Sequence, residues 1–97
     1  MSGFTNGQER SVVAIRDAIN ENDTIRDLYR TNRVFHEMIE AYCANPTCNS
    51  PLAVARHFTK QGGAFKLLAK AISDQWMDRM SDTMQAIRNN DNGHSTV

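Results

Sequence analysis

Residues 51–70, "PLAVARHFTKQGGAFKLLAK", contain four basic side chains, two adjacent glycines and no acidic residue. The stretch follows Ser50, and a serine cap before a proline is a strong helix start, because the missing proline N–H costs nothing at the first position. Gly62-Gly63 ends that helix, since glycine adopts left-handed backbone conformations freely. The stretch therefore predicts two helices joined by a glycine corner, in either a helical hairpin or a helix-turn-helix.

A helix-turn-helix needs a close helix crossing, a tight turn, and base-reading side chains on its second helix. Ala55 supplies the small residue for the crossing, and Lys66 and Lys70 can reach phosphates. Two features count against this reading. Thr59 and Lys60 stand where the turn normally carries an apolar residue, and lysines carry little sequence information.

The second helix of this stretch also offers few groups that read bases. Its exposed positions are expected to be mainly Ala64, Lys66 and Ala69. We therefore favour the helical hairpin and keep DNA binding by residues 51–72 as the alternative.

Apolar residues spaced by three and four along the chain predict an all-α fold. Ninety-seven residues make one compact domain. We expect about four helices, spanning approximately residues 7–20, 24–44, 51–60 and 64–89, with flexible termini at about 1–5 and 90–97. We expect the first helix to be capped by Asn6 with Glu9, with Thr5 and Gln8 as the alternative. A break within the last helix at Ser73-Asp74 stays open.

The predicted helix over residues 24–44 carries an unusually regular apolar seam with one polar member. The seam consists of Ile25, Leu28, Asn32, Phe35, Ile39 and Tyr42. In a packed seam an unpaired amide costs roughly 1–3 kcal/mol, whereas two copies of Asn32 can hydrogen-bond across a dimer. We expect this seam to join two copies in a homodimeric helical bundle, with an intramolecular seam as the alternative.

Residues 64–89 hold one apolar face over six turns. The face consists of Phe65, Leu68, Ile72, Trp76, Met80, Met84 and Ile87. Met77, Met80 and Met84, together with Trp76, make an adaptable cluster that serves either core packing or partner binding.

Charge is unevenly distributed in a chain whose formal net charge is zero. Residues 41–73 carry four bases and no acid, and lie between two segments that are each net acidic. On the last helix, bases near the start and acids further along repeat every four residues, against the helix macrodipole. We expect a partner-binding surface with a basic and an acidic end, formed by Arg56, Lys60, Lys66, Lys70, Asp74, Asp78 and Asp82.

No motif for catalysis or phosphate binding is present in the sequence. We therefore expect no enzyme, no cofactor and no metal site. No apolar run is long enough to span a bilayer, and the start of the chain lacks the features of a secretory signal. We accordingly expect a cytoplasmic protein whose two cysteines, Cys43 and Cys48, are reduced.

Together these features predict a small non-enzymatic regulator or inhibitor that acts by protein–protein binding through a helical surface. The expected partner is a larger protein. The alternative is a dimeric helix-turn-helix transcriptional regulator.

Overall fold

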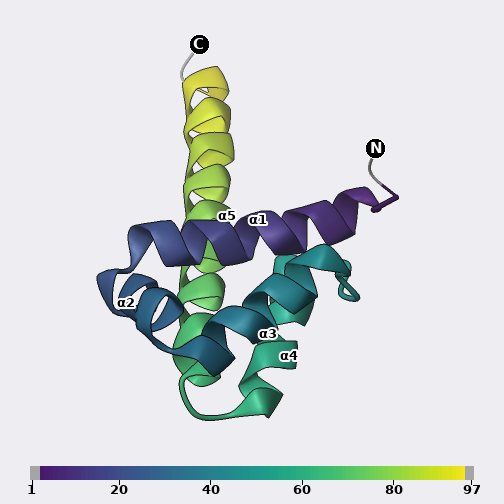
Figure 1. The fold of residues 1–97 in the computed structure, drawn as a ribbon. Coiled ribbons are helices and arrows are strands. Elements are labelled where there is room, and N and C mark those ends of the chain that lie inside the picture. The colour runs from purple at the N-terminus through teal and green to yellow at the C-terminus, as the bar shows by residue number, and fades with distance from the viewer. Residues whose placement is uncertain (1–2, 96–97) are drawn as a thin grey trace.

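The computed structural model describes the backbone of residues 3–95 and the side chains of residues 3–80. This part of the chain is built from helices, which confirms the predicted all-α class (Figure 1). The helices are α1 (Asn6–Glu21), α2 (Asp23–Thr31), α3 (Arg33–Ala44), α4 (Pro51–Gln61) and α5 (Phe65–Ser95). The helix predicted to end near residue 89 runs on to Ser95 and continues unbroken through Ser73-Asp74.

The prediction of one helix over residues 24–44 is wrong, because the chain bends at Asn32 between α2 and α3. Asn32 has an extended backbone, with φ −102° and ψ 108°. Its N–H donates to the Leu28 carbonyl at 2.8 Å, which ends α2. Its side-chain oxygen accepts from the Phe35 N–H at 3.1 Å, which starts α3. One short amide side chain therefore serves both helix ends.

At the start of α1 the favoured cap, Asn6 with Glu9, is wrong and the alternative is the one present. Thr5 with Gln8 forms the capping box of α1: the Thr5 hydroxyl accepts from the Gln8 N–H, and the Gln8 side chain accepts from the Thr5 N–H. Asn22 ends α1 and caps α2. Ser50 accepts from the Ala53 N–H at 3.1 Å, with Pro51 at the first helical position, as predicted.

A single apolar core joins the five helices. At its centre Phe65 stacks between Phe35 and Phe58, with ring centroids 5.0 and 5.7 Å apart. This stack connects α5 to α3 and α4 and contributes beyond the area that it buries. The largest fully buried apolar side chains are Phe35, Phe58, Ile15, Ile25, Ile39, Leu68, Ile72 and Val54.

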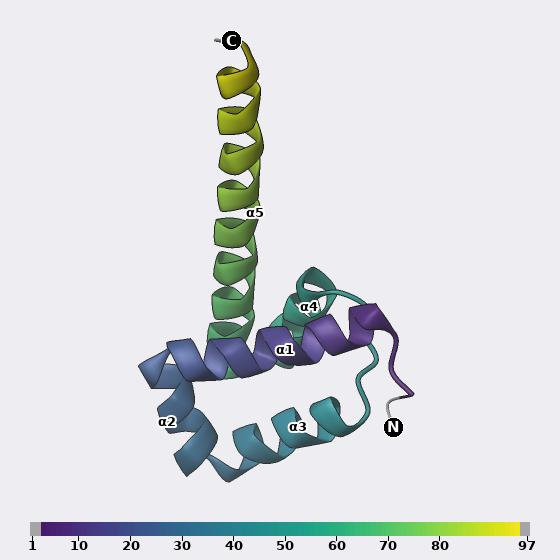
Figure 2. The same cartoon turned by 90° about the horizontal axis from the view of Figure 1, so that it is seen from above.

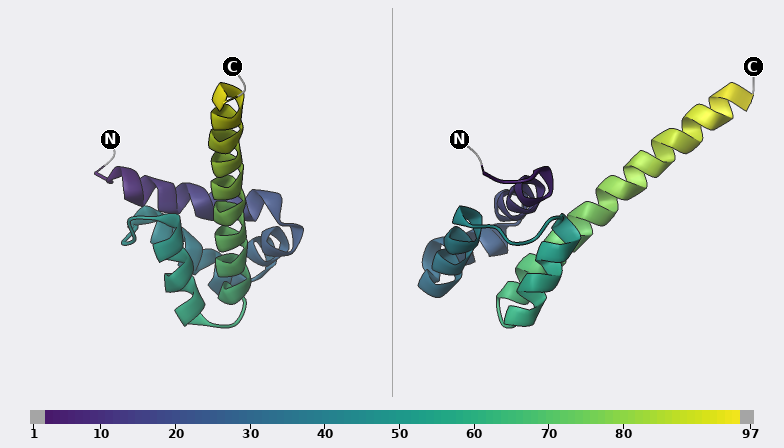
Figure 3. Two further views of the ribbon diagram at one scale, coloured as in Figure 1. Left: turned by 180° about the vertical axis from the view of Figure 1, so that it is seen from behind. Right: turned by 90° about the vertical axis from the view of Figure 1, so that its right-hand side faces the viewer.

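Helices α4 and α5 form an antiparallel hairpin, and they lie side by side in Figures 1 and 3. The corner uses Gly62 and Gly63 at φ 76° and 54°, where residues with a Cβ are strained. α1 crosses α5 steeply, and α5 then continues well past the other helices (Figure 2). The hairpin reading of residues 51–70 is therefore the one that the structure adopts.

Hydrogen bonds connect the loop between α3 and α4 to α1. The Gln8 side chain donates to the Pro46 carbonyl at 3.0 Å. The Tyr42 hydroxyl lies 2.9 Å from the Ser11 hydroxyl and accepts from the Cys48 N–H at 3.0 Å. Ser11 and Tyr42 are both buried, so these bonds fix the position of the loop relative to the core.

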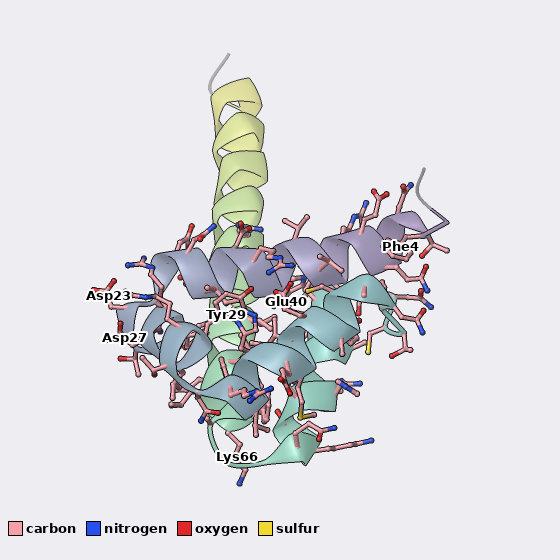
Figure 4. All side chains as sticks on the ribbon, viewed as in Figure 1. Phe4, Asp23, Asp27, Tyr29, Glu40 and Lys66 are labelled. Carbon is pink, nitrogen blue, oxygen red and sulfur yellow. The ribbon has the colours of Figure 1, made fainter. Side chains whose placement is uncertain are left out.

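A second polar cluster joins α1, α2 and α3. Arg16 donates to Glu40 at 2.7 Å and to the Tyr29 hydroxyl at 3.2 Å, and the Tyr29 hydroxyl donates to the same carboxylate oxygen. Figure 4 shows Tyr29 and Glu40 close together between these helices. The hydrogen bond from Arg16, assisted by that from Tyr29, holds the pKa of Glu40 below its ordinary value.

Candidate binding surface

The predicted dimer seam lies mostly inside this chain's own core. Ile25, Phe35, Ile39 and Tyr42 are buried there, and Leu28 packs partly buried against the same cluster. Asn32 is exposed and caps α3, so no unpaired amide is left in a packed seam. The intramolecular alternative thus describes the packing of these side chains, and the reason given for pairing two copies through Asn32 no longer applies.

Four members of the predicted charged surface form a continuous band on one helix. Lys66, Lys70, Asp74 and Asp78 are exposed at intervals of four residues along α5, and we call them the charged band. Lys70 and Asp74 form an ion pair at 3.0 Å. Figure 4 shows Lys66 at the α4–α5 corner, pointing away from the core. The predicted fifth member, Asp82, has a side chain outside the described part.

The remaining two predicted residues lie on the neighbouring helix. Arg56 and Lys60 are exposed one turn apart on α4. Among the described residues, no hydrogen bond or ion pair connects them to the charged band. The band on α5 is therefore the part of the predicted surface that the fold brings together.

An exposed leucine lies beside the charged band. Leu67 is 48% exposed and borders a shallow hollow of about 250 Å³ between α5 and the start of α2. The hollow is lined by Asn22, Thr24, Ile25, Leu67, Lys70, Ala71 and Asp74. An apolar centre with a charged rim is the usual composition of a protein–protein contact surface.

The sequence pattern did not single out Leu67, and it gave the wrong exposure for Ala69. Ala69 was expected to be exposed, but it is 3% exposed because α5 turns this position into the core. Leu67 is out of step with the apolar face of Leu68 and Ile72, which is the signal that could have identified it. Its position next to Lys70 and Asp74, and not its exposure alone, is what distinguishes Leu67 from other exposed apolar residues such as Val34.

A larger groove lies on another side of α5, where α1 crosses it. Its volume is about 990 Å³. Its apolar lining includes Val13 of α1, Pro51 of α4, and Ile72, Trp76 and Met80 of α5. Arg79, which also lines this groove, pairs with Asp17 at 2.9 Å and fixes α1 against α5.

The cysteines and histidines of the described residues do not form a metal-binding cluster. No group of three His, Cys, Asp or Glu side chains comes together within this part of the chain. Cys43 and Cys48 are free thiols, and burial raises the pKa of the Cys43 thiol. A raised thiol pKa lowers the population of the reactive thiolate.

No family model matches this chain, and neither a curated protein nor a solved structure matches it. Among the described helices, none combines the length and the apolar character needed to cross a bilayer.

Proposed function

We propose that this protein is a small non-enzymatic regulator or inhibitor that binds a larger protein through the charged band of α5. Leu67 would enter an apolar site on the partner, with Lys66 and Lys70 facing acidic residues and Asp74 and Asp78 facing basic ones. We further propose that it acts as a homodimer and in the cytoplasm, the latter resting on the sequence alone.

The observation that carries this proposal is the exposed position of Leu67 beside the charged band. Leu67 is 48% exposed, so its burial by a partner would lower the free energy of the complex. The neighbouring charges confer specificity and orientation more than affinity, because a band with a basic and an acidic end fits a partner in one direction.

The charged band is also unfavourable for the isolated helix. Lys66 lies in the first turn of α5, where a base opposes the macrodipole by some tenths of a kcal/mol, whereas the other three charges lie beyond that turn. Asp74 and Asp78 stand four residues apart and repel each other. A partner with the opposite charge pattern would relieve both effects.

Photo-crosslinking tests the proposal. A photoreactive amino acid at position 67 is compared with one at Val34, which is 63% exposed on α3. In native lysate treated with nuclease, we expect position 67 to capture one protein that position 34 does not. Equal capture at both positions would contradict the proposal.

A charge exchange tests the orientation. Lys70→Asp with Asp74→Lys keeps the ion pair but exchanges the two central charges, so that the band alternates in sign and loses its basic and acidic ends, and should lower crosslinking at position 67 by about tenfold or more. The matched control is Arg33→Glu with Glu37→Arg, which reverses another exposed pair of the same spacing, on α3. The control should leave the yield unchanged.

The same experiment distinguishes a protein partner from DNA binding by residues 51–72. The antiparallel hairpin of α4 and α5 lends the DNA-binding alternative no support, but its test is simple. Duplex binding by residues 51–72 would weaken steeply with salt and disappear in the Lys66→Glu, Lys70→Glu variant. Capture that disappears with nuclease would favour this alternative over a protein partner.

A further inference from the structure

The second half of α5 extends away from the rest of the molecule. Figures 1, 2 and 3 all show its last turns clear of the other four helices. The residues after Met80 span about 22 Å at the helical rise. An isolated helix of this length is marginal in water, so packing against another surface would stabilise it.

The side of α5 that faces the core continues into this extension. Ile72 is buried, Trp76 is half-buried, and Met80 is 43% exposed where the covering helices end. The sequence continues the same spacing with Met84 and Ile87, whose side chains lie outside the described part. We call these five residues the apolar stripe. The apolar stripe is apolar in sequence along its whole length, and at Met80, where the described side chains end, it is exposed.

We infer that a second copy of this chain covers the apolar stripe by packing its α5 antiparallel to the first. An antiparallel register centred beside Met80 places the two Met80 side chains together. It also places Trp76 near Met84 of the second copy, and Met77 opposite the same residue. This inference rests on the homodimer of the proposed function and is independent of the protein target.

The groove between α1 and α5 provides space for the end of the second helix. Its apolar lining includes Ile72, Trp76 and Met80, which are three members of the apolar stripe, and Val13, which is 52% exposed. The groove is also lined by Glu9, Arg10 and Arg79. In the antiparallel register, the part of the second α5 that carries Ile87 runs toward this groove. Each copy therefore supplies both a helix end and a groove, which is the reciprocal arrangement of a closed twofold dimer.

The distribution of charge also suits pairing with an identical helix. The apolar stripe contains no charged residue, so two copies of it do not repel. Asp74 and Asp78 lie on the opposite side of α5 at helical spacing, and would remain in water. Pairing through the apolar stripe thus leaves the charged band free for the larger protein.

Sedimentation equilibrium of the full chain tests the inference, and the single tryptophan, Trp76, reports on the same face. We expect a dimer whose tryptophan emission shifts to shorter wavelength as it forms. Met80→Glu should weaken the dimer by at least about a hundredfold, because it buries a charge. Val34→Glu, at an exposed position of α3, should leave the dimer affinity unchanged. A monomer at millimolar concentration, or a dimer insensitive to Met80→Glu, would overturn the inference.

Disulfide trapping tests the direction of pairing, with Cys43 and Cys48 replaced by alanine. Mixing Met77→Cys and Met84→Cys chains of different size should give the mixed disulfide as the main product. A parallel pair would instead link Met77→Cys chains to each other, and that result would overturn the antiparallel arrangement. Circular dichroism of each variant confirms that it is folded. Neither experiment contains the protein target, so loss of the dimer and loss of target binding are separate results.

Discussion

The hydroxyl oxygens of Ser11 and Tyr42 lie 2.9 Å apart and connect α1 to α3 in the core. The Ser11 hydroxyl donates to the Gln8 carbonyl at 2.7 Å, so the hydrogen between the two hydroxyls is the one from Tyr42. The same tyrosine oxygen accepts from the Cys48 N–H. One side chain therefore joins two helices and the loop that precedes α4.

Tyr42→Phe should lower the free energy of unfolding by about 1–3 kcal/mol, because it leaves buried polar groups without a partner. Chemical denaturation measures this loss. In a double-mutant cycle with Ser11→Ala, the two losses should not add, since the residues share a hydrogen bond. Additive losses would show that the two hydroxyls act independently.

Gly7 is the position where a single added carbon should be most harmful. A Cβ there would lie 2.1 Å from the Asn49 carbonyl oxygen, a backbone atom. Glycine to alanine normally stabilises a helix by roughly 1 kcal/mol. Gly7→Ala should instead destabilise the protein by about 1–3 kcal/mol, as overpacking does. Gly3→Ala, with no atom near the added carbon, is the control and should be neutral in thermal denaturation.

Asn32→Leu distinguishes a helix cap from a dimer seam. As a cap, Asn32 satisfies the Phe35 N–H, so its loss should cost about 0.5–2 kcal/mol. In a continuous seam, leucine would stabilise the pair of helices. Asn6→Ala is the comparison, because Thr5 rather than Asn6 caps α1, and we expect little change from it. Stabilisation by Asn32→Leu would contradict the break between α2 and α3.

The Arg16–Glu40 pair predicts a dependence of stability on pH. The folded protein holds the pKa of Glu40 below its ordinary value of 4.5, chiefly through the Arg16 hydrogen bond. The stabilisation is therefore present above that ordinary value and is lost as pH falls through the lower folded value. Glu40→Gln should cost at most about 1 kcal/mol near neutral pH, because both partners are about 40% exposed. The difference from wild type should shrink in acid; a difference that grows there would contradict the assignment.

Helix class and most helix ends could be predicted from the sequence, because capping and glycine corners are local signals. Ser50-Pro51 and Gly62-Gly63 lie where their chemistry requires. The break at Asn32 could not be predicted from the seam, because two helices that bend around one core keep the same apolar spacing on either side. Phe35 and Ile25 are buried in both arrangements.

The candidate surface could be predicted only in part. The spacing of Lys66, Lys70, Asp74 and Asp78 defines a band on any helix, so its charges were found. Which neutral residue lies beside them depends on where α4 and α1 pack against α5. That packing buries Ala69 and leaves Leu67 exposed, and periodicity alone does not determine it.

The most direct test of the account is the titration of an isotopically labelled chain with the partner captured at position 67, followed by nuclear magnetic resonance. We predict that the backbone signals of Leu67, Lys70 and Asp74 change on binding, while those of the matched pair Arg33 and Glu37 do not. Changes centred on α3, with the charged band of α5 unaffected, would contradict the account.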